Sequence, residues 1–340
     1  ELSFFSRQLS VLIDAELPLI QSLGLLAEQQ KNKYFTRVIT EVKEDVEAGA
    51  ALNQALRKHP KVFDDLYCNL VASGEQSGSL DTMLRRLADY QESMLKLRAK
   101  VRQAMIYPAA IVSFAIIVAI FMLWKVIPVF GGIYQELGAQ LPGLTAAVLG
   151  LSNFVSRYII VIVVGLIAIV VLYQRWSKTP AGREIVDRTK LKLPVMGNLM
   201  QKISLSRFTR TLSTLISGGV PMLESLKIAS TTTDNVIIER QVLNARQMVS
   251  EGKSLHDSLK QASRDQFPAM MIQMVNVGES TGTLDEMLGK LANFFDSEVD
   301  DAVSSLLSAL EPLVLIFVGG IVGTLVISMY LPLFNLIQQF

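Results

Sequence analysis

The chain is poor in the residues that build most catalytic and metal sites. Its 340 residues include one cysteine, Cys68, and two histidines, His59 and His256. A single cysteine excludes an internal disulfide and a cysteine-cluster metal site. Two isolated histidines supply neither a metal ligand set nor a base paired with a nucleophile. We therefore expect no catalytic residue, no cofactor and no metal.

An excess of charge of one sign is lacking as well. The 32 lysine and arginine residues almost balance the 31 aspartate and glutamate residues, so the formal net charge is +1. Nucleic-acid-binding proteins normally carry a clustered basic face that neutralises phosphates, so we expect no nucleic-acid partner. Residues 1–7 also lack the basic stretch and apolar core of a secretory signal. Because the chain starts with Glu1 rather than methionine, we expect its natural beginning to lie outside it.

Apolar residues, in contrast, are abundant. Hydrophobic residues make up 50% of the chain and charged residues only 19%, which is typical of an integral membrane protein. Three long runs are almost free of charged side chains, and a helix that crosses the bilayer needs about 20 apolar residues. The predicted spans are residues 104–127, 158–174 and 312–334.

Basic residues predict the orientation of these spans. They cluster between Lys96 and Arg102, before the first span, and between Arg175 and Lys192, after the second. The segment 126–156 between these two spans holds a single charged residue, Glu136. Because lysine and arginine are enriched on the cytoplasmic side, we expect a cytoplasmic N-terminus and a C-terminus on the opposite side of the membrane.

The chain contains one pattern twice. The motif Gly-Glu-x-x-Gly-x-Leu-Asp occurs in two copies that lie 204 positions apart. Its residues are Gly74, Glu75, Gly78, Leu80 and Asp81 in the first copy and Gly278, Glu279, Gly282, Leu284 and Asp285 in the second. The register continues into the apolar runs, where Pro108 and Pro128, at the start and end of a span, correspond to Pro312 and Pro332. Each repeat is therefore predicted to be a polar domain followed by a membrane helix.

Apolar residues in the polar domains follow a helical period, as Phe5, Leu9 and Leu12 do. The predicted fold class is an all-α membrane protein with two duplicated cytoplasmic helical bundles, of about six helices each, and three transmembrane helices. From Ser79 the last helix of the first bundle is expected to continue through Gln103 towards the membrane. The predicted domains are a bundle at 1–103, a span at 104–127, a short external loop or helix at 128–157, a span at 158–174, a second bundle at 175–311, a span at 312–334 and an external tail at 335–340.

The two motif copies are expected to form tight turns between helices. Glycine permits the backbone conformations of such a turn. Ser79 and Thr283 are placed to cap the following helix, the latter in a capping-box pattern with Glu286. Glu75 and Asp81, with their counterparts, are the best carboxylate candidates for acid or metal chemistry, but acidic groups near a helix start interact favourably with its dipole. We favour this structural role, with a partner contact or a divalent ion as the alternative.

With these residues in view, the chain resembles the inner-membrane platform proteins of type IV pili and type II secretion systems. The resemblance covers essentially all 340 residues, because the repeat, the motif and the number of spans coincide. The segments 58–63, 127–130 and 329–332 resemble the pilus (PilC-type) branch more than the secretion (GspF-type) branch. Members of the family usually carry an additional N-terminal segment before the first repeat.

The resemblance implies a non-enzymatic adaptor in the bacterial inner membrane, at the base of the fibre. Its cytoplasmic bundles are expected to engage hexameric pilus assembly or retraction ATPases, so that pilin subunits move between membrane and fibre. The other expected partners are inner-membrane pilus alignment proteins, the lipid bilayer and further copies of the chain, in a dimer or higher oligomer. A platform for pseudopilus assembly in type II secretion is the alternative.

Two other classes of protein fit the sequence less well. A channel or transporter can be built from duplicated halves, but transport repeats normally place polar or broken helices at mid-membrane, which these runs lack. A membrane-bound enzyme needs a convergent set of nucleophile, base or metal ligands that this chain does not assemble.

Overall fold

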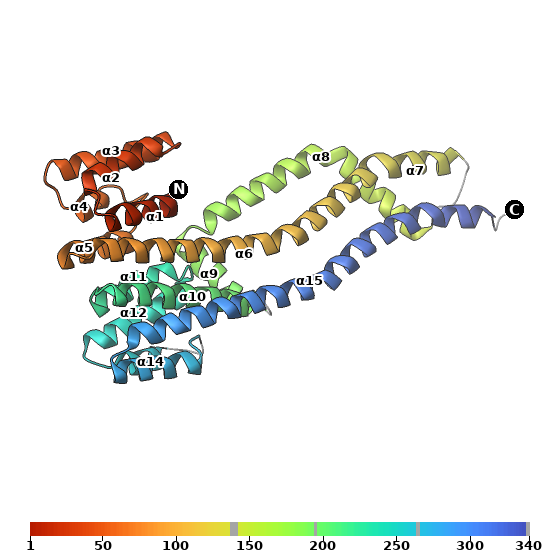
Figure 1. Cartoon of the computed structure of the whole chain (residues 1–340). Coiled ribbons are helices and arrows are strands. Elements are labelled where there is room, and N and C mark those ends of the chain that lie inside the picture. Colours follow the sequence, from red (N-terminus) through yellow and green to blue (C-terminus); the bar gives the residue numbers. More distant parts are fainter. Residues whose placement is uncertain (137–141, 194–195, 263–265, 338–340) are drawn as a thin grey trace. The chain divides into compact units, whose positions relative to one another are not determined.

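The computed structural model describes residues 1–136, 142–193, 196–262 and 266–337, and every regular element in these ranges is a helix (Figure 1). The first repeat forms α1 (Leu2–Asp14), α2 (Leu19–Gln29), α3 (Lys33–Glu47), α4 (Leu52–Arg57), α5 (Asp65–Ser77) and α6 (Leu80–Phe121). The second forms α10 (Met196–Ser217), α11 (Met222–Thr232), α12 (Val236–Ser250), α13 (Leu255–Ala262), α14 (Ala269–Thr281) and α15 (Leu284–Ile337). Between them lie the π-helix η1 (Met122–Val126), α7 (Ile127–Glu136), α8 (Gly143–Trp176) and α9 (Pro180–Lys192). The all-α prediction, with two bundles and three membrane-length helices, is confirmed.

The chain divides into two compact units. Unit 1 comprises Glu1–Lys100 and Asp187–Ala302 and holds both bundles. Unit 2 comprises Val101–Val186 and Val303–Phe340. The long helices α6 and α15 therefore contribute residues to both units, and the predicted continuation of α6 through Gln103 is confirmed.

Equivalent residues start equivalent helices in the two bundles. The Asn32 side chain accepts hydrogen bonds from the backbone N–H groups of Tyr34 and Phe35 and caps α3. Its counterpart Asn235 caps α12 in the same way. An asparagine cap supplies an acceptor for N–H groups that have no partner within the helix. The duplication is thus visible in local structure as well as in sequence.

Each bundle has its own apolar core. Phe5 is 1% exposed in the first bundle, and its ring meets Phe35 edge-on at a centroid distance of 5.5 Å. The equivalent Phe208 of the second bundle is fully buried and stacks on Phe267. Burying a large apolar side chain contributes about 1.5–3 kcal/mol, so the buried apolar residues of each core account for the packing of the short helices on α6 and α15.

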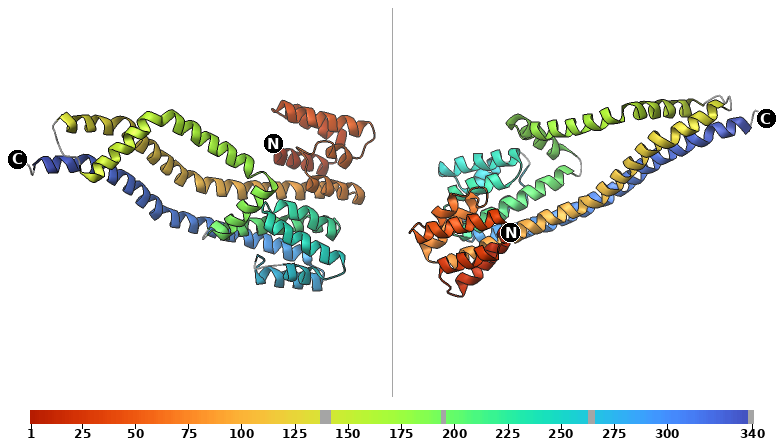
Figure 2. Two further views of the ribbon diagram at one scale, coloured as in Figure 1. Left: turned by 180° about the vertical axis from the view of Figure 1, so that it is seen from behind. Right: turned by 90° about the horizontal axis from the view of Figure 1, so that it is seen from above.

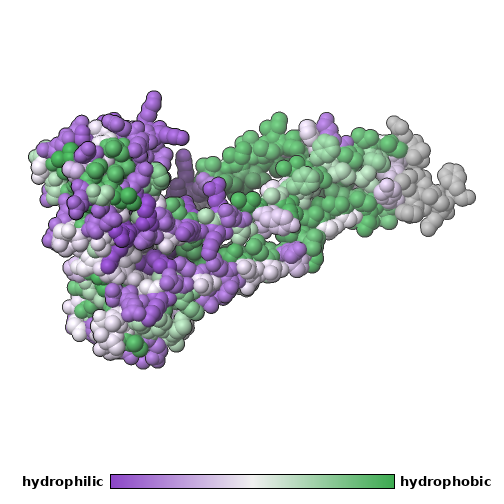
Figure 3. All heavy atoms as spheres, viewed as in Figure 1, coloured by the Kyte–Doolittle hydropathy of each residue, from purple (hydrophilic) through white to green (hydrophobic). Residues whose placement is uncertain are grey.

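Unit 2 presents an apolar surface, as the hydropathy view shows (Figure 3). Among the described residues, the helical stretches Leu80–Tyr134, Gly143–Trp176 and Leu284–Pro332 are long and apolar enough to cross a membrane. The predicted second span, 158–174, lies inside the longer helix α8, which begins directly after Pro142. The predicted external segment 128–157 is helical in α7 and in the first part of α8, and residues 137–141 of it lie outside the described residues. Of the predicted tail, residues 335–337 belong to α15 and residues 338–340 lie outside the described residues.

Candidate functional site

The repeated motif builds the corner between α5 and α6 and, in its second copy, between α14 and α15. Gly78 and Gly282 end α5 and α14 with φ values of +70° and +73°, a left-handed conformation that favours glycine. A Cβ atom on Gly74 would lie 3.0 Å from the Leu80 Cα, so a larger residue there would require the start of α6 to shift. The predicted tight turn is confirmed in both repeats.

The glutamate of the motif caps a helix other than the one that follows it. The Glu75 carboxylate accepts hydrogen bonds from the backbone N–H groups of Leu52, at 2.6 Å, and Asn53, at 3.0 Å, at the start of α4. Glu279 accepts the same pair of bonds at the start of α13, from Leu255 at 2.7 Å and His256 at 2.9 Å. Each carboxylate therefore places a negative charge at a helix N-terminus and satisfies two N–H groups there.

The aspartates of the motif lie where the sequence predicted, whereas the neighbouring hydroxyl residue Thr283 does not form the predicted capping box. Asp81 and Asp285 lie in the first turns of α6 and α15, as a favourable interaction with the helix dipole requires. The hydroxyl of Thr283 bonds to the Thr281 hydroxyl at 2.7 Å, and Glu286 pairs with Lys290 at 2.6 Å. The predicted capping box is therefore wrong, because both of its side chains are engaged by other neighbours.

The described residues contain no group of three or more His, Cys, Asp or Glu side chains that could hold a metal ion. Both oxygens of Glu75 and of Glu279 are occupied by backbone N–H groups. A contact of the motif with a partner stays a prediction.

The first and last helices of each bundle are joined by an equivalent arginine. Arg7 of α1 donates to Asp89 at 2.5 Å and to Glu92 at 2.9 Å, both on α6. The hydrogen bond from Arg7 lowers the pKa of the Glu92 carboxyl. In the second bundle Arg210 of α10 donates to Asn293 and Asp296 on α15. These contacts fix the first helix of each repeat against the helix that continues into unit 2.

The two bundles meet through an interface within unit 1, which we call the repeat interface. It joins α5 and α6 of the first repeat to α10 and α11 of the second. The Ser73 hydroxyl donates to the Gly218 carbonyl, and the hydroxyls of Tyr90 and Thr211 are hydrogen-bonded at 3.2 Å. The Leu70 side chain packs so closely on Gly218 that an added Cβ would lie 2.5 Å from its Cδ2 atom.

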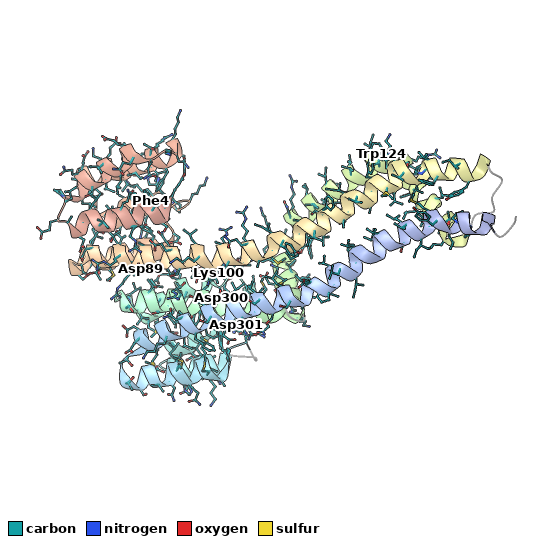
Figure 4. All side chains as sticks on the ribbon, turned by 45° about the vertical axis from the view of Figure 1, so that its right-hand side comes forward. Phe4, Asp89, Lys100, Trp124, Asp300 and Asp301 are labelled. Atoms are coloured by element: carbon teal, nitrogen blue, oxygen red, sulfur yellow. The ribbon has the colours of Figure 1, made fainter. Side chains whose placement is uncertain are left out.

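Apolar burial and an ion pair complete the repeat interface. Leu215, Val220 and Ile228 of the second repeat belong to the same buried cluster as the core of the first. At the far end of unit 1, Lys100 of α6 pairs with Asp300 of α15 at 2.6 Å (Figure 4). In unit 1 the segments 80–100 and 284–302 run in the same direction in both views of Figure 2.

In unit 2 the prolines predicted at the ends of the spans lie inside or at the start of helices. Pro108 belongs to α6, Pro128 to the first turn of α7, and Pro312 and Pro332 to α15. Proline has no N–H group, so it leaves the carbonyl four residues earlier without its helical partner. In a membrane such a carbonyl is costly unless another group satisfies it.

Hydroxyl groups of α8 satisfy two of these carbonyls. The Thr145 hydroxyl donates at 2.8 Å to the Ser328 carbonyl, which Pro332 leaves free. The Ser156 hydroxyl lies 3.4 Å from the Trp124 carbonyl, which Pro128 leaves free. Ser152, one turn before Ser156, donates to the carbonyl next to it, that of Leu123 in η1.

A fourth hydroxyl extends this arrangement, which we call the hydroxyl cluster: Tyr134, Thr145, Ser152 and Ser156 with their carbonyl acceptors. Tyr134 of α7 donates to the Met329 carbonyl of α15. The side chains of Tyr134, Thr145 and Ser152 are at most 4% exposed. The sequence analysis did not identify these residues, although hydroxyls at positions 152 and 156, one helical turn apart in an apolar run, were a usable signal.

Comparison with known proteins gives the same two-part division as the repeat. The family model described as type II secretion system protein F matches residues 5–128 and again residues 208–332. The chain is 42% identical over 332 residues to a type IV pilus assembly protein PilC of Myxococcus xanthus, covering 98% of this chain and 79% of that protein. It is 43% identical to the PilC protein of Thermus thermophilus, over 99% of this chain and 82% of the relative. A type II secretion system protein F of Vibrio cholerae is 35% identical over 99% of this chain and 82% of its own length.

Proposed function

The chain belongs to the type II secretion system protein F family, and from this premise we propose that it couples a cytoplasmic hexameric ATPase to the insertion or removal of pilin subunits at the base of a type IV pilus. Its family and its three membrane-length helices make it a multi-pass inner-membrane component of pilus or secretion machinery. The identities of 42 and 43% to pilus assembly proteins, against 35% to a secretion protein F, favour the pilus over the pseudopilus.

The observation that carries the coupling is that the last helix of each bundle is also a membrane span. α6 runs from Leu80 to Phe121 and α15 from Leu284 to Ile337. Backbone hydrogen bonds link each turn of these helices to the next, and each helix continues past the proline at which it can bend, Pro108 in α6 and Pro312 in α15. A displacement that an ATPase imposes on a bundle is then passed along α6 and α15 into the bilayer.

The orientation belongs to the same proposal. Basic residues cluster just before the first span, between Lys96 and Arg102. Lysine and arginine mark the cytoplasmic side of inner-membrane proteins, so both bundles face the cytoplasm, where ATP is available, and the C-terminus faces the periplasm.

The test uses the full-length chain in detergent with the purified pilus ATPases of the same organism. We expect binding and a change in the rate of ATP hydrolysis. A Gly-Ser-Gly insertion between Arg98 and Ala99 interrupts α6 at the end of unit 1, and we expect it to keep ATPase binding but abolish fibre assembly in cells. The same insertion between Gln30 and Lys31, in the turn after α2, is the matched control and should retain both. Failure of the full chain to bind any pilus ATPase, or normal fibres with α6 interrupted, contradicts the proposal.

A further inference from the structure

The repeat interface joins two different faces. The first repeat contributes a face of α5 and α6, with Leu66, Leu70, Ser73 and Tyr90; we call it the inner α5–α6 face. The second contributes a face of α10 and α11, with Thr211, Leu215, Gly218 and Ile228; we call it the inner α10–α11 face. The contacts are those between Ser73 and Gly218, Leu70 and Gly218, and Tyr90 and Thr211. An interface between unlike faces is heterologous, so it can be repeated from one copy to the next.

Because the bundles are duplicates, each carries both faces, and the repeat interface uses one from each. The first repeat keeps an unused equivalent of the α10–α11 face, made of Gln8, Val11, Ala15 and Leu25, which correspond to Thr211, Thr214, Gly218 and Ile228; we call it the outer α1–α2 face. The second keeps an unused equivalent of the α5–α6 face, made of Met270, Met274, Val277 and Phe294; we call it the outer α14–α15 face.

Exposure distinguishes the used faces from the unused ones. Ile228 is 4% exposed in the repeat interface, whereas its equivalent Leu25 is 40% exposed. Leu66 is 3% exposed, whereas its equivalent Met270 is 39% exposed. Next to them, Phe4 and Val11 on α1 are 62% and 58% exposed, and Val277 and Phe294 are 49% and 40% exposed. Apolar residues grouped in this way on a bundle surface mark an interaction site.

We propose that a second copy of the chain occupies these faces: the outer α14–α15 face of one chain packs on the outer α1–α2 face of the next and reproduces the repeat interface between molecules. The equivalences define the contacts. Ser73 with Gly218 becomes Val277 with Ala15, Leu70 with Gly218 becomes Met274 with Ala15, and Tyr90 with Thr211 becomes Phe294 with Gln8. Because Ala15 has a Cβ atom that Gly218 lacks, the flexible Met274 side chain has to take a different position from that of Leu70 in the repeat interface. Two polar contacts of the repeat interface are thus replaced by contacts that bury apolar side chains.

Charge agrees with this pairing. In the repeat interface Arg86 and Ser217 line one hollow between α6 and α10. In the proposed interface between two chains, the equivalent of Arg86 is Lys290 and the equivalent of Ser217 is Asp14. Lys290 already pairs with Glu286 and Asp14 with Arg85, so the intermolecular interface brings these two surface ion pairs together at its rim.

The arrangement also suits a membrane protein. The operation that relates the first bundle to the second keeps the segments 80–100 and 284–302 of unit 1 pointing in the same direction (Figures 1 and 2). Copies added by the same operation therefore keep these segments pointing the same way, and each segment continues into a membrane-length helix of its own chain. The proposal does not depend on motor coupling, so it can fail while the proposed function holds, and the reverse.

The experiment is disulfide cross-linking between two differently tagged full-length chains in membranes, both carrying Cys68→Ala. One chain carries Ala15→Cys and the other Val277→Cys. We expect a cross-linked dimer that contains both tags, and loss of that dimer when either substituted chain is expressed alone. Replacing Ala15→Cys by Arg37→Cys, on the exposed surface of α3, is the matched control and should not cross-link.

A second variant measures the interface without cross-linking. Val277→Asp places a charge in the outer α14–α15 face and should reduce the full-length chain in detergent from an oligomer to a monomer. Tyr34→Asp, at an equally exposed apolar position on α3, is the control and should leave the oligomer intact. Dimers of a single tag formed by Val277→Cys alone, cross-linking of Val277→Cys only to another protein, or an oligomer unaffected by Val277→Asp would each overturn the proposal.

Discussion

Replacing Glu75 by alanine tests the capping role of the repeated motif. The substitution removes the acceptor of two backbone N–H groups at the start of α4, which it bonds at 2.6 and 3.0 Å. Loss of a helix cap costs about 0.5–2 kcal/mol, and a hydrogen bond to a charged group contributes about 1.5–3 kcal/mol. Because Glu75 is half-buried and water replaces part of the lost interaction, we expect the free energy of opening the first bundle to fall by about 1–2 kcal/mol.

Cys68 provides the assay, because it is buried on the same helix, α5. Its thiol reacts with an alkylating reagent only when the first bundle opens, and at low reagent concentration the rate follows the opening equilibrium. A loss of about 1–2 kcal/mol corresponds to alkylation about 5–30 times faster. Glu75→Gln keeps one acceptor oxygen and should give an intermediate rate.

The second repeat supplies the matched control. Glu279→Ala removes the same two bonds at the start of α13, in the other bundle, and should change the reactivity of Cys68 far less. An unchanged rate in Glu75→Ala, or equal acceleration by both substitutions, would show that the carboxylates do not stabilise their own bundles.

Three further predictions concern other parts of the chain. Thr145→Val leaves the carbonyl freed by Pro332 without its donor and should lower the stability of the detergent-solubilised chain by about 1 kcal/mol; Pro332→Ala, which restores a helical N–H, should largely rescue it in a double-mutant cycle. Gly278→Ala forces a Cβ to within 2.9 Å of backbone and should cost about 1–3 kcal/mol in denaturant unfolding, whereas Gly150→Ala, which meets no atom within 4 Å, should be neutral or stabilising. Burial raises the pKa of the Cys68 thiol to about 11, so on raising the pH the folded state keeps the thiol proton to a higher pH than the unfolded state does. The free energy of unfolding of the first bundle should therefore be constant below about pH 8.5 and fall as the pH rises towards 11. Cys68→Ala should reduce this fall.

The sequence was sufficient for features that depend on local pattern and duplication. Helical periodicity, charge-free runs and the recurrence of Gly78 as Gly282 predicted the bundles, the spans and the tight corners. The sequence was insufficient where a side chain bonds to a residue far away along the chain. The capping of α4 by Glu75 joins positions 23 residues apart, so the motif suggested the wrong helix start. The spacing of the motif likewise established which residues are equivalent, but not which faces of the two bundles meet.

Unit 2 illustrates a similar gap. The sequence analysis placed Pro128 and Pro332 at the ends of spans, whereas Thr145, Ser152 and Ser156 lie in the segment 128–157, which it predicted to be external. Their association depends on how α8 lies against α7 and α15, which no single-helix pattern encodes. The groups that satisfy the freed carbonyls could therefore be assigned only from the structure.

The hydroxyl cluster, which links α8 to η1 and to α15 and links α7 to α15, consists of uncharged donors and acceptors. A membrane potential acts on charge, at about 2.3 kcal/mol per elementary charge per 100 mV, and so exerts almost no force on these bonds. These four hydrogen bonds are consequently insensitive to the electrical component of the proton-motive force.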